Sequence, residues 1–232
     1  MAGHFEAVPG GGAAIALDEV EISILRSLAV QLLELFGPGD EPVEGADPLA
    51  ALFAEGPSEP PSDPALARLF PDAYGGPKAP DDARARADSA EFRRFTEHDL
   101  RARKRADALA VVRTLDSVVL GGRGDEATQS GEGAGDTESA EADAPSRRSR
   151  KRTAKRRAAE GAVLRLGPDE CRQWLGALND LRLAIGTRLE VTDEDDNEEL
   201  YRLPDSDPRK PMVMAYLWLG GLQETLIETL TP

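Results

Sequence analysis

Residues 121–157 constrain the fold more than any other stretch, because they contain almost no side chain that a core could bury. Residues 121–145 carry seven acids and one arginine, whereas residues 146–157 carry eight bases and no acid. Neither block can bury enough apolar surface to offset the entropy of ordering its backbone. We therefore predict a disordered linker, acidic and then basic, over 121–158.

The segments on either side of this linker, 1–120 and 159–232, are predicted to be two halves of one domain. A chain of 232 residues suits a single core with appendages. The sequence HFEAV-PGGG-AAIAL near the N-terminus is typical of a β-hairpin, and AVLRL at 162–166 of a third strand that joins it. The predicted fold is thus mainly α-helical, with a small antiparallel sheet and a disordered insertion.

Apolar residues at helical spacing predict the helices around this sheet. Asp18 and Glu21 form the pattern of a capping box at the start of the first helix. The long helix predicted over 89–119 carries an apolar stripe, which we expect to face the core. The stripe comprises Phe92, Phe95, Ala106, Leu109 and Ala110. The predicted helices cover about 19–36, 89–119, a segment from 168 onward, and 212–229. Two short helices, each opened by an Asp-Pro pair, are predicted at 47–54 and 63–70.

The charge balance limits the classes of partner that we expect this chain to bind. A net charge of −15 disfavours general binding to nucleic acid or to anionic membranes. Nucleic-acid binding is expected only through the basic segment Arg147–Arg157, which lacks aromatic side chains for base stacking. The sequence shows no leader and no apolar run long enough to span a bilayer, and Cys171 is its single cysteine. We expect a cytoplasmic protein with no membrane partner.

Residues for catalysis or metal binding are scarce. His4, His98 and Cys171 cannot make a structural zinc set, and the acidic run DEDDNEE lacks the spacing of a calcium loop. The glycines of PGGG are not followed by the residues of a phosphate-binding loop. Cys171 at a helix start could carry a lowered pKa, but a packed cysteine is the favoured interpretation. We expect no catalytic, cofactor or metal residue, which favours a protein that is not an enzyme and leaves an enzyme as an alternative.

Polar residues on apolar helix faces are the sharpest local feature. Arg182 lies in the arc formed by Trp174, Leu178, Leu181 and Ile185, where an unpaired guanidinium would be costly. We predict that Arg182 contacts a polar partner on another helix, with snorkelling to solvent and a ligand pocket as alternatives. The predicted polar seam comprises Asp99, Arg103, Asn179, Arg182 and Gln223.

The segment LFPDAY is a candidate docking loop for another protein. It comprises Leu69, Phe70, Pro71, Asp72 and Tyr74, with Ala73 between the last two. Aromatic residues usually find burial, which favours the alternative that the loop is fastened to the core of this same chain.

Five segments together resemble an uncharacterised actinobacterial family, domain of unknown function two-thousand-seventeen. The resemblance implies a cytoplasmic protein. Genes of this family commonly lie near those for the ClpS protease adaptor, a JAB-type metalloprotease and a small sulfur-carrier protein, which implies proteolysis or sulfur metabolism as its context. The segments are EISILRSLAVQLLEL, DPALARLFPDAY, EFRRFTEHDLRARK, CRQWLGALNDLRLAIGTRLEV and YLWLGGLQETLIETL.

Three functions remain open at this point. The favoured one is a non-enzymatic regulatory or adaptor protein that acts through protein contacts, with the partner and the oligomeric state unknown. The second is a regulator that binds nucleic acid through its basic segment or a winged-helix-like arrangement. The third is an enzyme with a pocket formed by Arg182 and Asp99.

Overall fold

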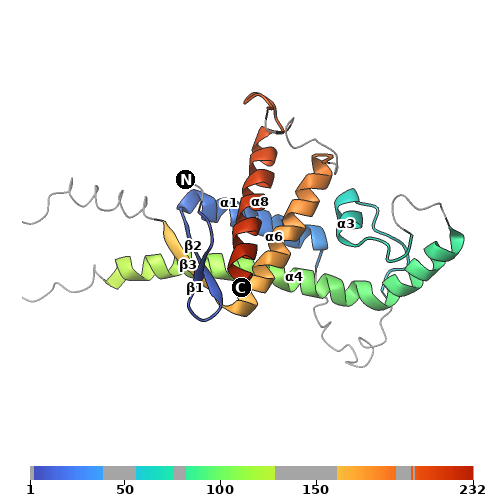
Figure 1. The fold of residues 1–232 in the computed structure, drawn as a ribbon, viewed down its shortest axis with the longest axis horizontal. Coiled ribbons are helices and arrows are strands. Elements are labelled where there is room, and N and C mark those ends of the chain that lie inside the picture. Colours follow the sequence, from blue (N-terminus) through green and yellow to red (C-terminus); the bar gives the residue numbers. More distant parts are fainter. Residues whose placement is uncertain are drawn as a thin grey trace, which may run out of the picture.

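A computed structural model of the chain describes residues 3–38, 56–75, 82–128, 161–191, 200 and 202–231. Between 120 and 128 it describes the backbone alone. Figure 1 shows the arrangement. The elements are β1 (Glu6–Val8), β2 (Gly12–Leu17), α1 (Glu19–Phe36), α3 (Pro64–Leu69), α4 (Ala83–Thr128), β3 (Ala162–Leu166), α6 (Pro168–Arg188) and α8 (Lys210–Leu230).

The three strands form one antiparallel sheet in the order β1-β2-β3, which confirms the predicted hairpin and third strand. The turn between β1 and β2 contains Gly10 and Gly11 with φ of 102° and 85°, which glycine adopts without a steric penalty. Alternation along the paired strands places one set of side chains toward the helices. This buried set is Ala13, Ile15, Leu17, Leu164 and Leu166.

Helix α6 lies at the centre of the molecule and contacts α3, α4 and α8 (Figure 1). Its Trp174 is fully buried and meets Phe5 edge to face, with ring centroids 5.9 Å apart. The apolar stripe predicted from Trp174, Leu178, Leu181 and Ile185 is buried as expected. The two halves of the chain therefore share one core.

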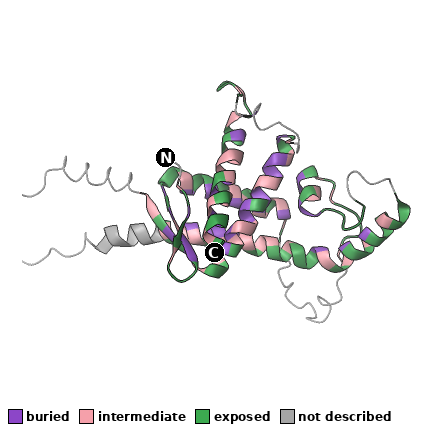
Figure 2. Ribbon diagram, in the orientation of Figure 1, coloured by how far each residue is buried: buried purple, intermediate pink, exposed green. Residues whose placement is uncertain are grey.

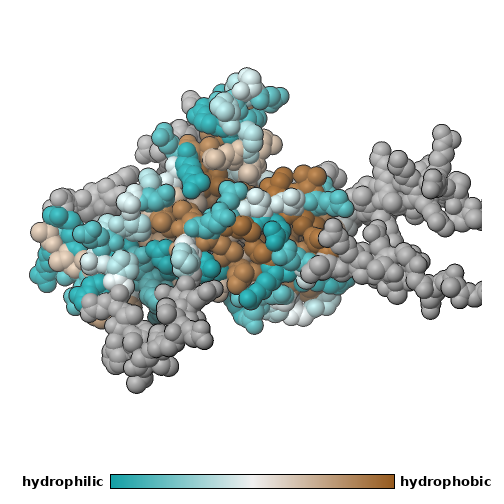
Figure 3. All heavy atoms as spheres, turned by 180° about the vertical axis from the view of Figure 1, so that it is seen from behind, coloured by the Kyte–Doolittle hydropathy of each residue, from teal (hydrophilic) through white to brown (hydrophobic). Residues whose placement is uncertain are grey.

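Helix α1 packs on α4 and closes the rear of the core. Its N-terminus has the predicted capping box: the Asp18 carboxylate accepts from the amides of Val20 and Glu21, and Glu21 accepts from the Asp18 amide. Seen from behind, apolar side chains gather across the middle of the molecule, where α1 lies (Figure 3). Val20 and Ile24 of α1 are among the exposed apolar residues.

Helix α4 faces the core with a different side from the one predicted. Phe92 and Phe95 are 47% and 67% exposed, whereas Arg93 and Glu97 are buried. The prediction was wrong because it chose the stripe of Phe92 and Phe95, whereas the apolar residues that α4 buries are Ala108, Val111, Val112 and Leu115. Here the charges of Arg93 and Glu97 pair one helical turn apart, which makes burial of this polar side possible.

The boundaries of α4 also differ from the prediction. The helix runs from Ala83 to Thr128, instead of 89–119, and so extends eight residues into the predicted linker. The rest of that linker within 129–158, including the basic segment Arg147–Arg157, lies outside the described residues, as does the short helix predicted at 47–54. Among the described residues, no helix combines the length and the apolar character needed to cross a lipid bilayer.

We predict that Asp18→Ala lowers the free energy of unfolding by about 1 kcal/mol, because it leaves first-turn amides of α1 without an acceptor. Thermal or urea unfolding followed by circular dichroism measures the change. Asp18→Asn is the matched control, since its side-chain oxygen still caps the helix. Equal stability of Asp18→Ala and the wild type would contradict a stabilising cap.

Candidate functional site

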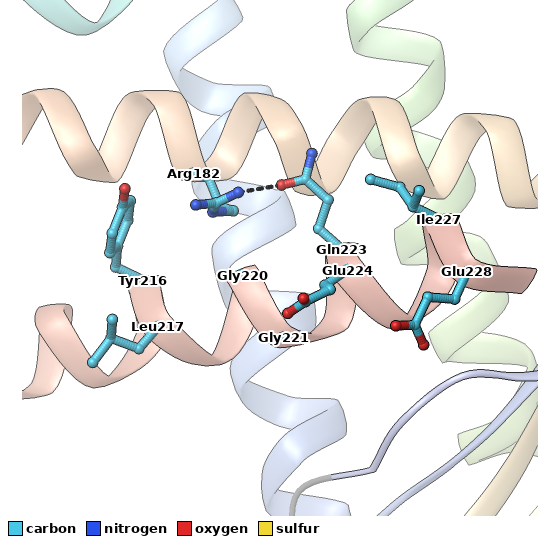
Figure 4. A pocket seen from close by; sticks show the side chains of 9 residues that line it. All are labelled: Arg182, Tyr216, Leu217, Gly220, Gly221, Gln223, Glu224, Ile227 and Glu228. Carbon is cyan, nitrogen blue, oxygen red and sulfur yellow. Dashed lines mark hydrogen bonds between the residues drawn. The ribbon is translucent and has the colours of Figure 1, made fainter. Parts of the chain in front are cut away.

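An open groove of about 660 Å³ runs along α8 beside α6 and is the candidate site. Figure 4 shows Arg182 reaching across from α6, with Tyr216 and Ile227 on either side of it. Every other residue that lines the groove belongs to α8. The lining comprises Arg182, Tyr216, Leu217, Gly220, Gly221, Gln223, Glu224, Ile227 and Glu228.

Arg182 joins the two helices through polar contacts. Its Nη1 donates a hydrogen bond to Oε1 of Gln223 at 2.5 Å, and its guanidinium lies over the ring of Tyr216 at 5.3 Å from the centroid. Nε2 of Gln223 in turn donates to Oδ1 of Asn179 at 3.5 Å. The Nε–H of Arg182 is buried, with no hydrogen-bond partner among the described residues. The guanidinium thus lines the groove, while its unpaired Nε–H is closed off inside the helix contact.

Two glycines make this crossing possible. A Cβ on Gly186 of α6 would lie 3.2 Å from Cε2 of Tyr216, which is tighter than ordinary contact. A Cβ on Gly220 of α8 would lie 3.5 Å from Nε of Arg182. Each helix therefore lacks a side chain where a large group from the other helix passes. Packing of this kind fixes the position of Arg182 at the floor of the groove.

The structure brings together three members of the predicted polar seam and leaves two apart. Asn179, Arg182 and Gln223 lie side by side at the α6–α8 contact. Asp99 and Arg103 are exposed on α4 and do not line the groove. The expected pocket formed by Arg182 with Asp99 is therefore wrong. Its cause is the reversed face of α4, which places Asp99 on the outside.

The candidate docking loop is largely fastened to the core. Leu69 and Phe70 are each 2% exposed. Both Nη atoms of Arg93 donate to the Phe70 carbonyl at 3.1 Å, and Nη2 also donates to Asp72 at 2.8 Å. Pro71, Asp72 and Tyr74 remain exposed. Leu69 and Phe70 cannot meet a partner in this conformation, so any docking would fall to the exposed three.

Sequence reasoning missed the buried charges behind this loop. Nη1 of Arg93 donates to Oε2 of Glu97 at 2.5 Å, and Nη2 of Arg101 donates to Oε1 of Glu97 at 2.7 Å. The usable signal was the spacing, since Arg93, Glu97 and Arg101 recur every fourth residue and share one helix face.

It also missed the acids beside Gln223. Glu224 and Glu228 are exposed, lie one turn apart on α8 and line the groove. Their signal is the same four-residue spacing on the helix that bears Gln223.

A second cluster of charges lies where α4 meets α6. Nζ of Lys104 pairs with Oδ1 of the buried Asp180 at 2.5 Å. Burial raises the pKa of Asp180 and also that of the nearby Asp107, where the charge of Arg103 opposes the shift. Gly176 of α6 leaves room for Asp107, since a Cβ there would lie 2.8 Å from Oδ2. These charges couple the two helices and stand apart from the groove.

Cys171 is fully buried in the core. Burial raises the pKa of its thiol, which disfavours the reactive thiolate. Within the described ranges no three His, Cys, Asp or Glu side chains gather closely enough to hold a metal ion. The groove itself offers the guanidinium of Arg182, exposed carboxylates and apolar surface, which is a set of groups suited to binding.

Comparison with known proteins places the chain in a family. The model of the family described as Domain of unknown function (DUF2017) matches residues 2–230. The chain belongs to this family. The match spans both halves of the domain and confirms the resemblance carried by the five segments.

Curated relatives match over a shorter stretch. The chain is 37% identical over 67 residues to "Oxidative stress regulator AosR" of Mycobacterium tuberculosis and of Mycobacterium bovis. These alignments cover 29% of this chain and 29% of each relative. No solved structure matches.

We predict that Arg182 and Gln223 stabilise the α6–α8 contact as a coupled pair. In a double-mutant cycle of Arg182→Met and Gln223→Met, urea unfolding should give a coupling energy of about 1 kcal/mol. Arg188→Met, an exposed position on the same helix, is the control and should show no coupling to Gln223. Additive effects of the Arg182 and Gln223 substitutions would contradict the seam.

We predict a pH dependence that arises from Asp107. Its pKa is higher in the folded protein than in the unfolded chain, so the folded state binds this proton more tightly. The resulting stability is complete below the unfolded value of about 3.9 and is lost as the pH rises through the folded value. Asp107→Asn, which keeps the shape without the charge, should therefore raise the melting temperature at pH 7 and change it little below about pH 3.5.

Glu91→Gln is the matched control for this experiment, because Glu91 is exposed on the same helix. It should leave the melting temperature unchanged at both pH values. A melting temperature of Asp107→Asn at or below that of the wild type at pH 7 would refute the assigned cost of burying this carboxylate.

Proposed function

We propose that this protein is a non-enzymatic regulator that binds a segment of another protein in the α6–α8 groove. The observation that carries the proposal is the composition of the groove, in which a fixed cation at the floor, exposed acids and exposed apolar side chains lie together (Figure 4). Exposed carboxylates in an open groove are well hydrated, which suits recognition better than proton transfer.

The groove favours a partner segment with basic and apolar side chains. Glu224 and Glu228 offer two carboxylates one turn apart, and Ile227 between them is 44% exposed. Lysine or arginine residues of the partner would pair with the acids, while an apolar residue would cover Ile227. Attraction between exposed charges weakens with salt, so this binding should weaken as well.

The relatives support a regulatory role. The similar mycobacterial proteins are described as oxidative stress regulators, although the alignment covers 29% of each. Because the Cys171 thiol is buried, the proposal assigns regulation to protein contacts and not to chemistry at this thiol. The family resemblance suggests the cytoplasm as the place, and proteolysis or sulfur-carrier pathways as the context, in which to look for the partner.

We predict that the double substitution Glu224→Arg, Glu228→Arg removes the partner. Tagged wild-type protein incubated with native cell extract should retain one protein in a stoichiometric ratio, identified by mass spectrometry. The variant should lose it, because two cations would repel a basic segment. With the purified partner, calorimetry should show a dissociation constant at least tenfold higher for the variant.

Glu34→Arg is the matched control, since Glu34 is an exposed acid on α1, outside the groove. It should bind the partner as the wild type does. Circular dichroism verifies that each variant is folded. Recovery of no stoichiometric partner, or equal binding by the groove variant, would refute the proposal.

A further inference from the structure

The side of α4 that points away from the core carries aromatic residues that remain partly exposed. We call this side the outer face of α4; it comprises Asp88, Phe92, Phe95, Asp99, Arg103, Ala106, Ala110 and Arg113. Phe92 and Phe95 are 47% and 67% exposed, and much of the N-terminal part of α4 is coloured as exposed in Figure 2. Exposed aromatic residues of this kind mark a surface for association.

The aromatic rings are held in place from below. Phe92 meets Tyr74 edge to face, with centroids 6.1 Å apart, and Tyr74 is fastened through its backbone to the hydroxyl of the buried Ser89. The guanidinium of Arg94 lies 5.9 Å from the centroid of Phe95. The contact with Tyr74 therefore restricts the ring of Phe92, which reduces the conformational freedom that this ring loses when a partner binds.

A hollow of about 460 Å³ lies further along the same helix, beside β3 and the first turns of α6. Its apolar lining comes from small or half-buried residues of α4, namely Ala106, Leu109 and Ala110. Charged and polar side chains surround it: Arg113, Thr114, Ser117, Arg165, Glu170 and Gln173. One helix therefore bears aromatic projections near its N-terminus and an apolar hollow near its C-terminus.

These features become complementary when two such helices lie antiparallel with a twofold axis beside residue 101. In that register, a residue of one copy faces a residue of the other copy when their two residue numbers add up to about 202. Phe92 then faces Ala110 of the other copy, and Phe95 faces Ala106. Asp99 faces Arg103, and by symmetry Arg103 faces Asp99. Each of these two exposed charges at the centre of the face therefore lies opposite a charge of the other sign in the second copy.

The two ends of the outer face show the same pairing of opposite charges. Asp88 and Arg113 are both exposed, and they face each other in this register. From Asp88 to Arg113 the paired helices would extend over about 38 Å at 1.5 Å per residue. The agreement of aromatic with small residues, and of acid with base, along this length identifies one occupant.

We propose that the outer face of α4 binds the same face of a second copy of this chain, as an antiparallel pair with a twofold axis beside Arg101. The rings of Phe92 and Phe95 enter the hollow of the other copy, and two Asp99–Arg103 pairs lie across the axis. This interface uses none of the residues of the α6–α8 groove, so it holds whether or not a partner protein binds there.

Sedimentation equilibrium of the full chain over a wide concentration range tests this proposal. The wild type should show a reversible equilibrium of monomer and dimer. Asp99→Arg should raise the dissociation constant at least tenfold, because it places four cations at the axis, and Arg103→Asp should do the same with four acids. Phe95→Ala, at an exposed position that does not contribute to the core, should also raise it at least tenfold.

Charge exchange makes the test specific for this register. The double variant Asp99→Arg, Arg103→Asp should restore the dimer, because both pairs form again with reversed polarity. An equimolar mixture of the two single variants should form a mixed dimer, although neither single variant dimerises well alone. Glu34→Arg is the control and should dimerise as the wild type does.

A wild type that stays monomeric at all concentrations would overturn the proposal. So would a dimer that neither Asp99→Arg nor Phe95→Ala weakens, or one that charge exchange fails to restore. Capture experiments with the α6–α8 groove are independent of these results, because the two sets of test substitutions share no residue and have only the control Glu34→Arg in common.

Discussion

The pairing of Arg93 with Glu97 inside the molecule sets the orientation of α4. Both side chains are almost fully buried, and Arg93 also donates to the Phe70 carbonyl and to Asp72. Removal of one member of such a pair costs about 3–5 kcal/mol, because it leaves a charge in the interior. The long helix therefore keeps this polar side inward. The inward position of Arg93 fixes the loop from Leu69 to Tyr74 against α4. It also determines which side of α4 is exposed to solvent.

The sequence predicts most of the elements because their signals are local. A capping box, an Asp-Pro start and a period-two strand each depend on neighbouring residues, and α1, α3 and β3 have the predicted character. The orientation of α4 could not be predicted in this way. In its N-terminal half, the aromatic residues Phe92 and Phe95 and the alternating charges occupy different sides. The charged side is buried there because Arg93 donates to the carbonyl of Phe70, which lies 23 residues earlier.

The α6–α8 contact shows the same dependence on long-range partners. Arg182 could be placed in the interior because Trp174, Leu178 and Ile185 define one clear stripe, and Gln223 lies within a similar stripe on α8. When each of two helices has one clear apolar face, the polar side chains on those faces meet as the helices pack. Asp99 failed as a partner because its own helix offered two possible faces. The polar seam was therefore predictable only as far as each helix face was.

The reversed orientation of α4 also bears on how strongly two copies can associate. Burial of a phenylalanine side chain is worth about 1.5–3 kcal/mol when complete, so the four half-exposed rings of a dimer contribute on the order of 5 kcal/mol. Loss of translational and rotational freedom costs roughly 4–15 kcal/mol. The rings alone leave little surplus, and the Asp99–Arg103 pairs at the axis decide the balance. A dimer built in this way dissociates on dilution and responds to salt.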